Sequence, residues 1–271
     1  MWMFPFAFED PAKAAERRVA RAQRALAKKQ PWPEVKPVRP DAVWEDVGII
    51  ADTFAPHNPL AAIFPDVVVG IEDGVESPDG RLRYVRQPLP LYHGLPVGQS
   101  RSDYGGDSRA YFDAEIDVPA LHYRSRFEGC TAGRWEVWMG LAPLELWTQR
   151  SGIKAATGDV VLGGLGMGWL LSEIAAKPSV KSIVVVERDK MLLDWFGRRL
   201  CAALPKVKDV LCADVFEVAE RFDYGKTRFV LDIWPTLGDA KWDRRLEKLR
   251  NDGARCWAWG SARGAQRNWP R

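Results

Sequence analysis

From about position 158 onwards, short apolar runs alternate with segments of helical spacing. The apolar runs cover 159–164, 182–187, 208–214, 228–234 and 254–260. The helical segments cover 169–177, 191–204 and 240–251. Strands buried on both faces by crossover helices have this appearance. We therefore predict an α/β fold with a Rossmann-like, doubly wound, mostly parallel sheet, shortened after its fifth strand because the sequence ends soon after that run.

The first half of the chain has a different pattern. A segment at 11–30, rich in Ala, Arg and Lys, predicts a helix, and a proline-rich stretch to Pro40 predicts an extended linker. Between 41 and 137, short alternating runs separated by turn residues predict antiparallel strands and loops. From 134 to 158 the pattern turns helical. The expected organisation is therefore a basic helix and linker at 1–40, a small β-rich or irregular region at 41–137, and a Rossmann-like domain at 138–271.

Charge changes the interpretation of the predicted N-terminal helix. The net charge is only +3, yet nine lysines and arginines lie between Pro11 and Pro40, against Glu16 and Glu34. Such an arm is either a solvated or packed surface helix, or a surface for an acidic partner such as nucleic acid.

Composition excludes several classes of protein. The 271 residues, 46% hydrophobic and 28% charged, are typical of a globular chain, and no uncharged apolar run is long enough to span a bilayer. The N-terminus lacks the order of residues found in secretory signals, so we expect a cytoplasmic protein without a membrane partner. The four cysteines form no CxxC pair, which argues against a zinc site and a disulfide framework, and we expect no metal.

Glycines gather where the first predicted strand meets the first helix of this domain. Gly163, Gly164, Gly166 and Gly168 leave bare backbone at a helix N-terminus, where a ligand can approach closely. A dinucleotide GxGxxG motif would need glycine at Trp169, and no lysine follows as in a phosphate-binding P-loop. The motif is GxGxG, and Glu187 ends the next strand, where a carboxylate can accept both hydroxyls of a ribose.

The pieces "GGLGMG", "VVERD", "CADVF" and "LDIW" resemble the class I S-adenosylmethionine-dependent methyltransferases, and among them the spermidine-synthase-like branch. By that resemblance the cofactor is S-adenosylmethionine. Glu187 would bind the ribose hydroxyls and Arg188 would flank the adenine. Asp214 would accept from the adenine amino group, with Val215 beside it. Asp232 would lie near the sulfonium as the catalytic group, and Trp234 is either core or a wall of the pocket.

Several alternatives remain open. The position where many methyltransferases hold the cofactor's amino group with an acid is Leu162, and Asp214 is also a plausible helix cap. The sequence thus predicts a methyltransferase with an unidentified acceptor, an aminopropyltransferase like spermidine synthase, or a non-catalytic protein that keeps the cofactor fold. The apolar fifth strand would form an exposed edge, so we expect the N-terminal region or a second subunit of a homo-oligomer to cover it.

Overall fold

A computed structural model describes residues 11–28, 46–97, 108–124, 133–234 and 239–261. The predicted proline-rich linker lies outside these residues. The chain divides into two compact units. The first is built from Met1–Glu34, Asp41–Ala55 and Pro88–Ile116, and the second from Val35–Pro40, Pro56–Gln87 and Asp117–Arg271.

The first unit contains the predicted basic helix, α1 (Pro11–Ala27), and a sheet in the order β1-β5-β4. The strands are β1 (Val47–Ile49), β4 (Leu95–Pro96) and β5 (Arg109–Phe112), and β1 runs parallel to β5. Ala22 and Ala25 of α1 are buried in a cluster with Tyr111 of β5. Arg21 also pairs with Asp46 at 2.8 Å. The alanine face of α1 is therefore packed near its C-terminal end, and nucleic-acid binding by this arm stays a prediction.

The second unit begins with the 3₁₀ turn Pro59–Ala62 and a sheet in the order β2-β3-β6-β7. Its strands are β2 (Gly70–Glu76), β3 (Leu82–Leu89), β6 (Ile116–Arg124) and β7 (Trp135–Gly140). The pairs β2–β3 and β6–β7 are antiparallel, as the alternating pattern predicts.

The predicted helix at 134–158 is wrong over its first part. Residues Trp135–Gly140 form β7, and the helix α2 covers only Pro143–Ala155. The strand forms because β-branched and aromatic residues such as Val137, Trp135 and Trp138 favour extended backbone, and because the segment pairs with β6. Pro143 then starts α2, since proline fits the first turn of a helix.

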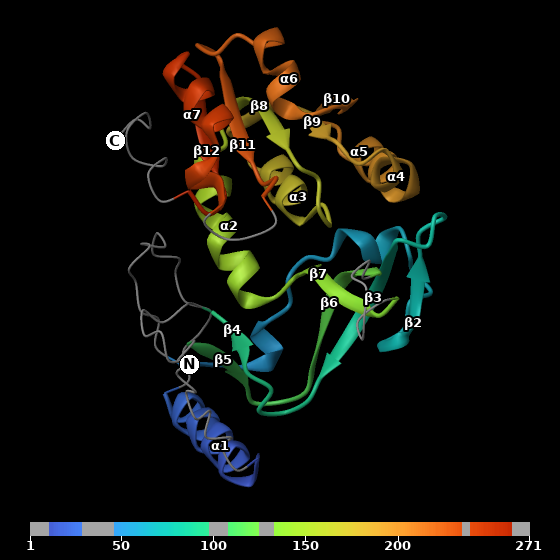
Figure 1. The fold of residues 1–271 in the computed structure, drawn as a ribbon, viewed down its shortest axis with the longest axis vertical. Helices are drawn as coiled ribbons and strands as arrows, with labels where there is room; N and C mark the ends of the chain where they lie inside the picture. Colours follow the sequence, from blue (N-terminus) through green and yellow to red (C-terminus); the bar gives the residue numbers. More distant parts are fainter. Residues whose placement is uncertain (1–10, 29–45, 98–107, 125–132, 235–238, 262–271) are drawn as a thin grey trace, which may run out of the picture. The chain divides into compact units, whose positions relative to one another are not determined.

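The larger sheet of the second unit has five strands in the order β10-β9-β8-β11-β12, and every neighbouring pair is parallel. They are β8 (Gly158–Gly163), β9 (Val180–Glu187), β10 (Val207–Cys212), β11 (Thr227–Leu231) and β12 (Arg255–Ala258). From β8 the chain adds β9 and then β10 on one side. It then crosses to the other side of β8, where it adds β11 and β12. The Rossmann-like doubly wound fold is thus confirmed, with its switch point between β8 and β11 (Figure 1).

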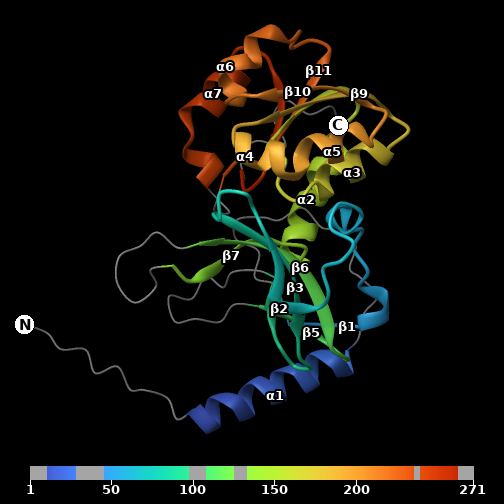
Figure 2. The same cartoon turned by 90° about the vertical axis from the view of Figure 1, so that its right-hand side faces the viewer.

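Helices flank this sheet in Figures 1 and 2. They are α3 (Trp169–Ala176), α4 (Lys190–Leu192), a π-helical turn (Leu193–Gly197), α5 (Arg198–Ala202), α6 (Val215–Val218), a 3₁₀ turn (Ala219–Arg221), a second 3₁₀ turn (Asp239–Trp242) and α7 (Arg244–Asn251). Cys256 and Ala258 of β12 share a core cluster with α6 and α7, whereas Trp257 between them packs against Gly152 of α2. Alternate residues of a strand point to opposite faces, so both faces of the sheet are buried.

The side chains of the fifth strand are covered by α2, whereas the cover expected for its backbone edge stays a prediction. Trp257 and Trp259 are 5% and 8% exposed, and their indole nitrogens donate to Ser151 and Thr148 of α2. A helix of the same unit therefore buries the apolar side chains for which we expected the N-terminal region or a second subunit. Homo-oligomerisation stays a prediction, and the apolar side chains of the fifth strand no longer argue for it.

Among the described residues, no helix combines the length and apolar character needed to cross a membrane.

Candidate functional site

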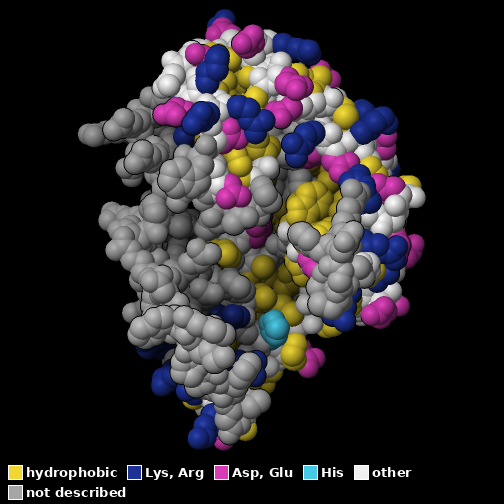
Figure 3. All heavy atoms as spheres, viewed as in Figure 1, with side chains coloured by type: hydrophobic (Ala, Val, Ile, Leu, Met, Phe, Trp, Pro, Cys, Tyr) yellow, Lys and Arg dark blue, Asp and Glu magenta, His cyan; other side chains and the backbone are white. Residues whose placement is uncertain are grey.

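A pocket of about 830 Å³ lies in the second unit at the carboxyl ends of β8, β9 and β11. Parallel α/β sheets bind ligands at this position, beyond the switch point. Residues of β7 and α2 complete its wall. Figure 3 shows positive and negative side chains interspersed over the part of the surface that holds the parallel sheet, so this face carries no field of a single sign.

The glycine loop that links β8 to α3 lines the pocket through Gly164, Gly166 and Gly168, which have φ values of +86°, +52° and +79°. A Cβ on Gly164 would lie 2.1 Å from the carbonyl oxygen of Asp232, and one on Gly168 would lie 2.1 Å from Cδ2 of Leu200. Glycine is therefore needed at Gly164 because of the backbone contact, and it is favoured at Gly168 mainly because of the positive φ. Gly163 is different, because it ends β8 and is not part of the pocket lining.

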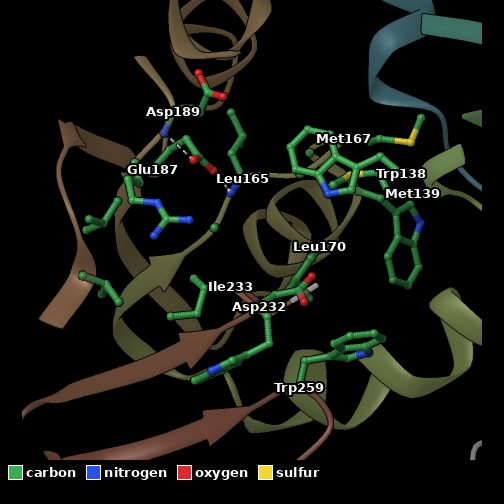
Figure 4. Close-up of a pocket in the computed structure, with 18 of the residues that line it drawn as sticks. Trp138, Met139, Leu165, Met167, Leu170, Glu187, Asp189, Asp232, Ile233 and Trp259 are labelled. Carbon is green, nitrogen blue, oxygen red and sulfur yellow. Dashed lines mark hydrogen bonds between the residues drawn. The ribbon is translucent and has the colours of Figure 1, made fainter. Parts of the chain in front are cut away.

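Glu187, the last residue of β9, is hydrogen-bonded to the glycine loop. Its Oε2 accepts from the backbone amide of Leu165 and its Oε1 from that of Asp189, both at 2.8 Å. Figure 4 shows the Glu187 side chain reaching toward Leu165 at one end of the pocket. Each carboxylate oxygen has a further lone pair, so both remain able to accept from a ligand hydroxyl.

The residues predicted for the adenine also line the pocket, but Asp214 is already engaged. Its Oδ1 accepts from the amide of Phe216 and caps α6, and its Oδ2 accepts from Arg245 at 3.1 Å. The guanidinium of Arg245 lies 4.5 Å from the centre of the Phe216 ring. The capping role considered from the sequence is therefore present, while Arg188 and Val215 stand beside it in the lining.

Asp232 follows β11 at the other end of the pocket, where it meets two side chains of α2. The Nε2 atom of Gln149 donates to Asp232 Oδ2 at 2.7 Å and to Glu145 Oε1 at 2.5 Å. Burial raises the pKa of Asp232 to about 7. Burial, followed by the charge of Asp232, raises the pKa of Glu145 to about 8. Raised and coupled values of this kind are typical of functional carboxyl pairs.

Trp234 proves to be both pocket wall and packed side chain. It is half-buried, and its ring lies edge-on to Phe216 with the ring centres 6.5 Å apart. Its indole nitrogen donates to Asp243 at 3.2 Å. The following residue, Pro235, lies outside the described residues.

The pocket brings together all the predicted site residues except Gly163. They come from the ends of four strands, β8, β9, β10 and β11: Gly164, Gly166, Gly168, Glu187, Arg188, Asp214, Val215, Asp232 and Trp234. Their role in binding a cofactor stays a prediction.

Sequence reasoning missed the contributions of β7 and α2, notably Glu145, Gln149 and Trp138. An acid and an amide four positions apart share one face of a helix, and here that face is otherwise apolar. This spacing was the signal that could have found Glu145 and Gln149.

Comparisons with known proteins extend only to the fold. No protein-family model matches the sequence, and no curated protein matches it. Among 33 matching chains of solved structures is a spermidine synthase in complex with the transition-state analogue AdoDATO, with 12% identity and a TM-score of 0.34. It is matched over 62% of this chain and 56% of its own.

A spermidine synthase from Thermotoga maritima has 11% identity and a TM-score of 0.35, over 68% of this chain and 62% of its own. The protein thus spans about three fifths of each of these chains, and the likeness concerns the fold alone.

Proposed function

We propose that the protein is a transferase that uses S-adenosylmethionine and passes its methyl group to an acceptor bound beside Asp232. The observation that carries this proposal is the placement of two acids at opposite ends of one pocket. Glu187 stands beside the glycine loop and Asp232 stands after β11 (Figure 4). A nucleoside at the first end would direct its reactive carbon toward the second.

The nucleoside end of the pocket has groups that suit a ribose. The glycine loop exposes backbone, and Glu187 is held by two amides, so its carboxylate is fixed before a ligand arrives. A preorganised acceptor loses less entropy on binding. The adenine would lie near Arg188 and Val215, and Arg245 occupies the oxygen of Asp214 that would otherwise accept from its amino group.

The opposite end fits the amino acid part of the cofactor less well. Leu162 is fully buried and supplies no acid for the cofactor's amino group. This observation favours a second candidate, aminopropyl transfer from the decarboxylated donor, because that donor has no α-carboxylate and its amino group lies at the end of a flexible chain. The carboxyl groups of Asp232 and Glu145 are the acids available at this end.

When bound, either donor supplies a carbon activated by a sulfonium. The protein has to hold the acceptor in line with that carbon, take up its proton and exclude water. Asp232 would accept the proton at Oδ1 or Oδ2. Trp234 and the largely buried Trp259 form apolar walls on either side of it.

The test is calorimetric titration with S-adenosylmethionine, its demethylated product and the decarboxylated donor, followed by single-turnover transfer from whichever donor binds. Binding of the first two with methyl transfer supports the proposal. Preferential binding of the decarboxylated donor supports the second candidate. Absence of binding by all three would overturn both, and tight binding without transfer to any acceptor would favour the non-catalytic alternative.

A further inference from the structure

The side chains of α2 extend the acceptor end of the pocket into a built polar site. Gln149 is only 4% exposed, and its one amide nitrogen donates to both Glu145 and Asp232. An amide NH₂ has two hydrogens, so each carboxyl receives one of them. The two acids are thereby held on either side of a single buried group, although they are far apart in the chain.

The two acids share their charge. Two half-buried carboxylates this close resist ionising together. Burial raises the pKa of both Asp232 and Glu145, and the charge of Asp232 raises the pKa of Glu145 further. Among the described residues, neither acid forms an ion pair with a lysine or arginine. Near pH 7 to 8 the pair therefore holds about one negative charge that no cation of the described chain balances.

The other charged groups of the pocket are at its nucleoside end. The remaining acids are Glu187, Asp189 and Asp214, and each accepts backbone amides. The bases in the lining are Arg81, Arg188, Lys190 and Arg245. Arg81 pairs with Asp189 and Arg245 with Asp214, so these acids are already balanced. Glu187 accepts only backbone amides and is the acid assigned to the ribose, so the pair on α2 and β11 is the anionic site at the acceptor end.

Apolar side chains surround that pair. Figure 4 shows Asp232 between Leu170 and Trp259, with Trp138 and Met139 farther along the same wall. Leu170 and Trp259 are 5% and 8% exposed, whereas Trp138, which also lines the pocket, is 39% exposed. Indole faces also attract cations. A ligand here would meet one negative charge inside an apolar and aromatic enclosure.

We infer that Glu145, Gln149 and Asp232 form a subsite that takes the single amino group of an acceptor whose remaining body is apolar. One cation matches the one negative charge of the pair. A second amino group would have to enter the apolar wall or approach the bases of the lining, and both are unfavourable. The inference rests on the proposed function for its placement of the acceptor, and it names the acceptor's chemical class.

The pair also provides the proton acceptor that such a ligand needs. The amine enters as an ammonium ion and has no free lone pair. Transfer of one N–H proton to the ionised carboxylate leaves a neutral amine and a pair with both carboxyls protonated, so charge and protons balance. Gln149 keeps both oxygens in place throughout, because it donates to each of them. Glu145 acts here as a positioning and proton-sharing group beside Asp232.

The experiment measures binding of phenethylamine by calorimetry, with and without the demethylated product of S-adenosylmethionine. The comparison ligands are 2-phenylethanol, which lacks the charge, and 1,4-diaminobutane, which carries two amino groups. We expect phenethylamine to bind at least tenfold more tightly than either. Its affinity should rise from pH 6 to pH 8 as the pair loses protons, by at most about tenfold per pH unit for one linked proton.

Variants separate this site from a merely structural role. Asp232→Asn should weaken phenethylamine binding at least tenfold, and Glu145→Gln should end the rise in affinity at a lower pH because a single carboxyl then titrates. A structural role for Glu145 would weaken binding equally at every pH and leave the profile unchanged. The matched control is Glu220→Gln, at an exposed acid outside the pocket, which should behave as wild type.

The outcomes also separate this inference from the proposed function. Binding of the amine without any nucleoside binding would support the subsite and overturn the transferase. Nucleoside binding together with equal affinity for amine and alcohol, or with preference for the diamine, would overturn the subsite and leave the transferase standing.

Discussion

The backbone amide of Leu165 donates a 2.8 Å hydrogen bond to Oε2 of Glu187, so the acid expected to bind a ribose also fastens the loop around it. The backbone amide of Asp189 donates to the other oxygen, Oε1, at the same distance. Glu187 therefore holds the loop and is also the acid predicted to bind the ribose. A substitution there should change both the shape of the loop and the contacts to a ligand.

Replacing Glu187 by Ala should weaken binding of the nucleoside by about 1.5 to 3 kcal/mol, the range for hydrogen bonds to a charged group. Calorimetry with the demethylated product measures this loss. Hydrogen exchange at the amide of Leu165 measures the loosening of the loop in the absence of ligand. Faster exchange with unchanged affinity would show that Glu187 holds only the loop.

The glycines of the loop differ in what they tolerate. Gly164→Ala places a Cβ 2.1 Å from the backbone oxygen of Asp232, and backbone cannot move aside as a side chain can. We expect a loss of at least about 3 kcal/mol in the free energy of unfolding. Gly166→Ala meets the Met139 sulfur at 3.3 Å and should cost about 1 to 2 kcal/mol, mainly from its positive φ. Urea unfolding of both variants checks the order, and equal losses would contradict it.

The acid pair should make the protein less stable as pH rises. Burial raises the pKa of Asp232 to about 7 and that of Glu145 to about 8, whereas an unfolded chain ionises such groups near pH 4. Between these limits the folded chain holds protons that the unfolded chain has lost. The free energy of unfolding therefore falls as pH rises, by roughly 1.4 kcal/mol per unit for each proton concerned, and the fall ends above about pH 8.

Urea midpoints of wild type and Glu145→Gln at pH 5 and pH 8 test this slope. Because Gln cannot titrate, the variant should lose less stability over the interval than wild type does. Glu220→Gln should retain the full wild-type slope. Identical slopes in all three proteins would mean that the buried pair does not titrate in this range.

The contact between Gly152 and Trp257 reverses an ordinary rule for helices. Alanine in a helix interior is usually favoured over glycine by about 1 kcal/mol. A Cβ on Gly152 would lie 2.7 Å from Cε3 of Trp257, however, so Gly152→Ala should destabilise the protein by about 1 to 3 kcal/mol. Denaturant unfolding followed by tryptophan fluorescence measures the effect. Combining the substitution with Trp257→Leu should recover part of the loss, and no recovery would point to a cause other than this contact.

The fold and half of the pocket were predictable because they depend on local patterns. The apolar run at 228–234 and the glycines after 163 occupy neighbouring strand ends in any parallel sheet of this order. Asp232 and Glu187 could also be picked out from the sequence. An acid at the end of a buried strand costs free energy unless it has a partner, so such an acid is a candidate for a site.

The other half of the pocket depends on contacts between segments that are far apart in the chain. Gln149 and Asp232 are 83 positions apart, and their hydrogen bond exists only because α2 packs on β11 and β12. The strand β7 was missed because tryptophan, valine and methionine fit either periodicity over six residues, and its pairing with β6 decided between them. The hydrogen bond from Arg245 of α7 to Asp214 likewise joins residues that are distant in the chain.

Asp232 carries the most direct prediction about chemistry. It ends a buried strand opposite Glu187, it accepts from Gln149, and apolar walls exclude water around it. Asp232→Asn keeps the shape and can still accept from Gln149 through its remaining oxygen, but it removes the charge and the proton acceptor. A positioned acid or base contributes about 10²- to 10⁴-fold to a rate, so single-turnover transfer should fall within that range. Affinity for the demethylated product should change little, because the nucleoside end is untouched.

The measurement uses labelled S-adenosylmethionine and the decarboxylated donor separately, with Glu220→Gln as the control that keeps its rate. An Asn variant that turns over at the wild-type rate would remove Asp232 from the mechanism as the required base.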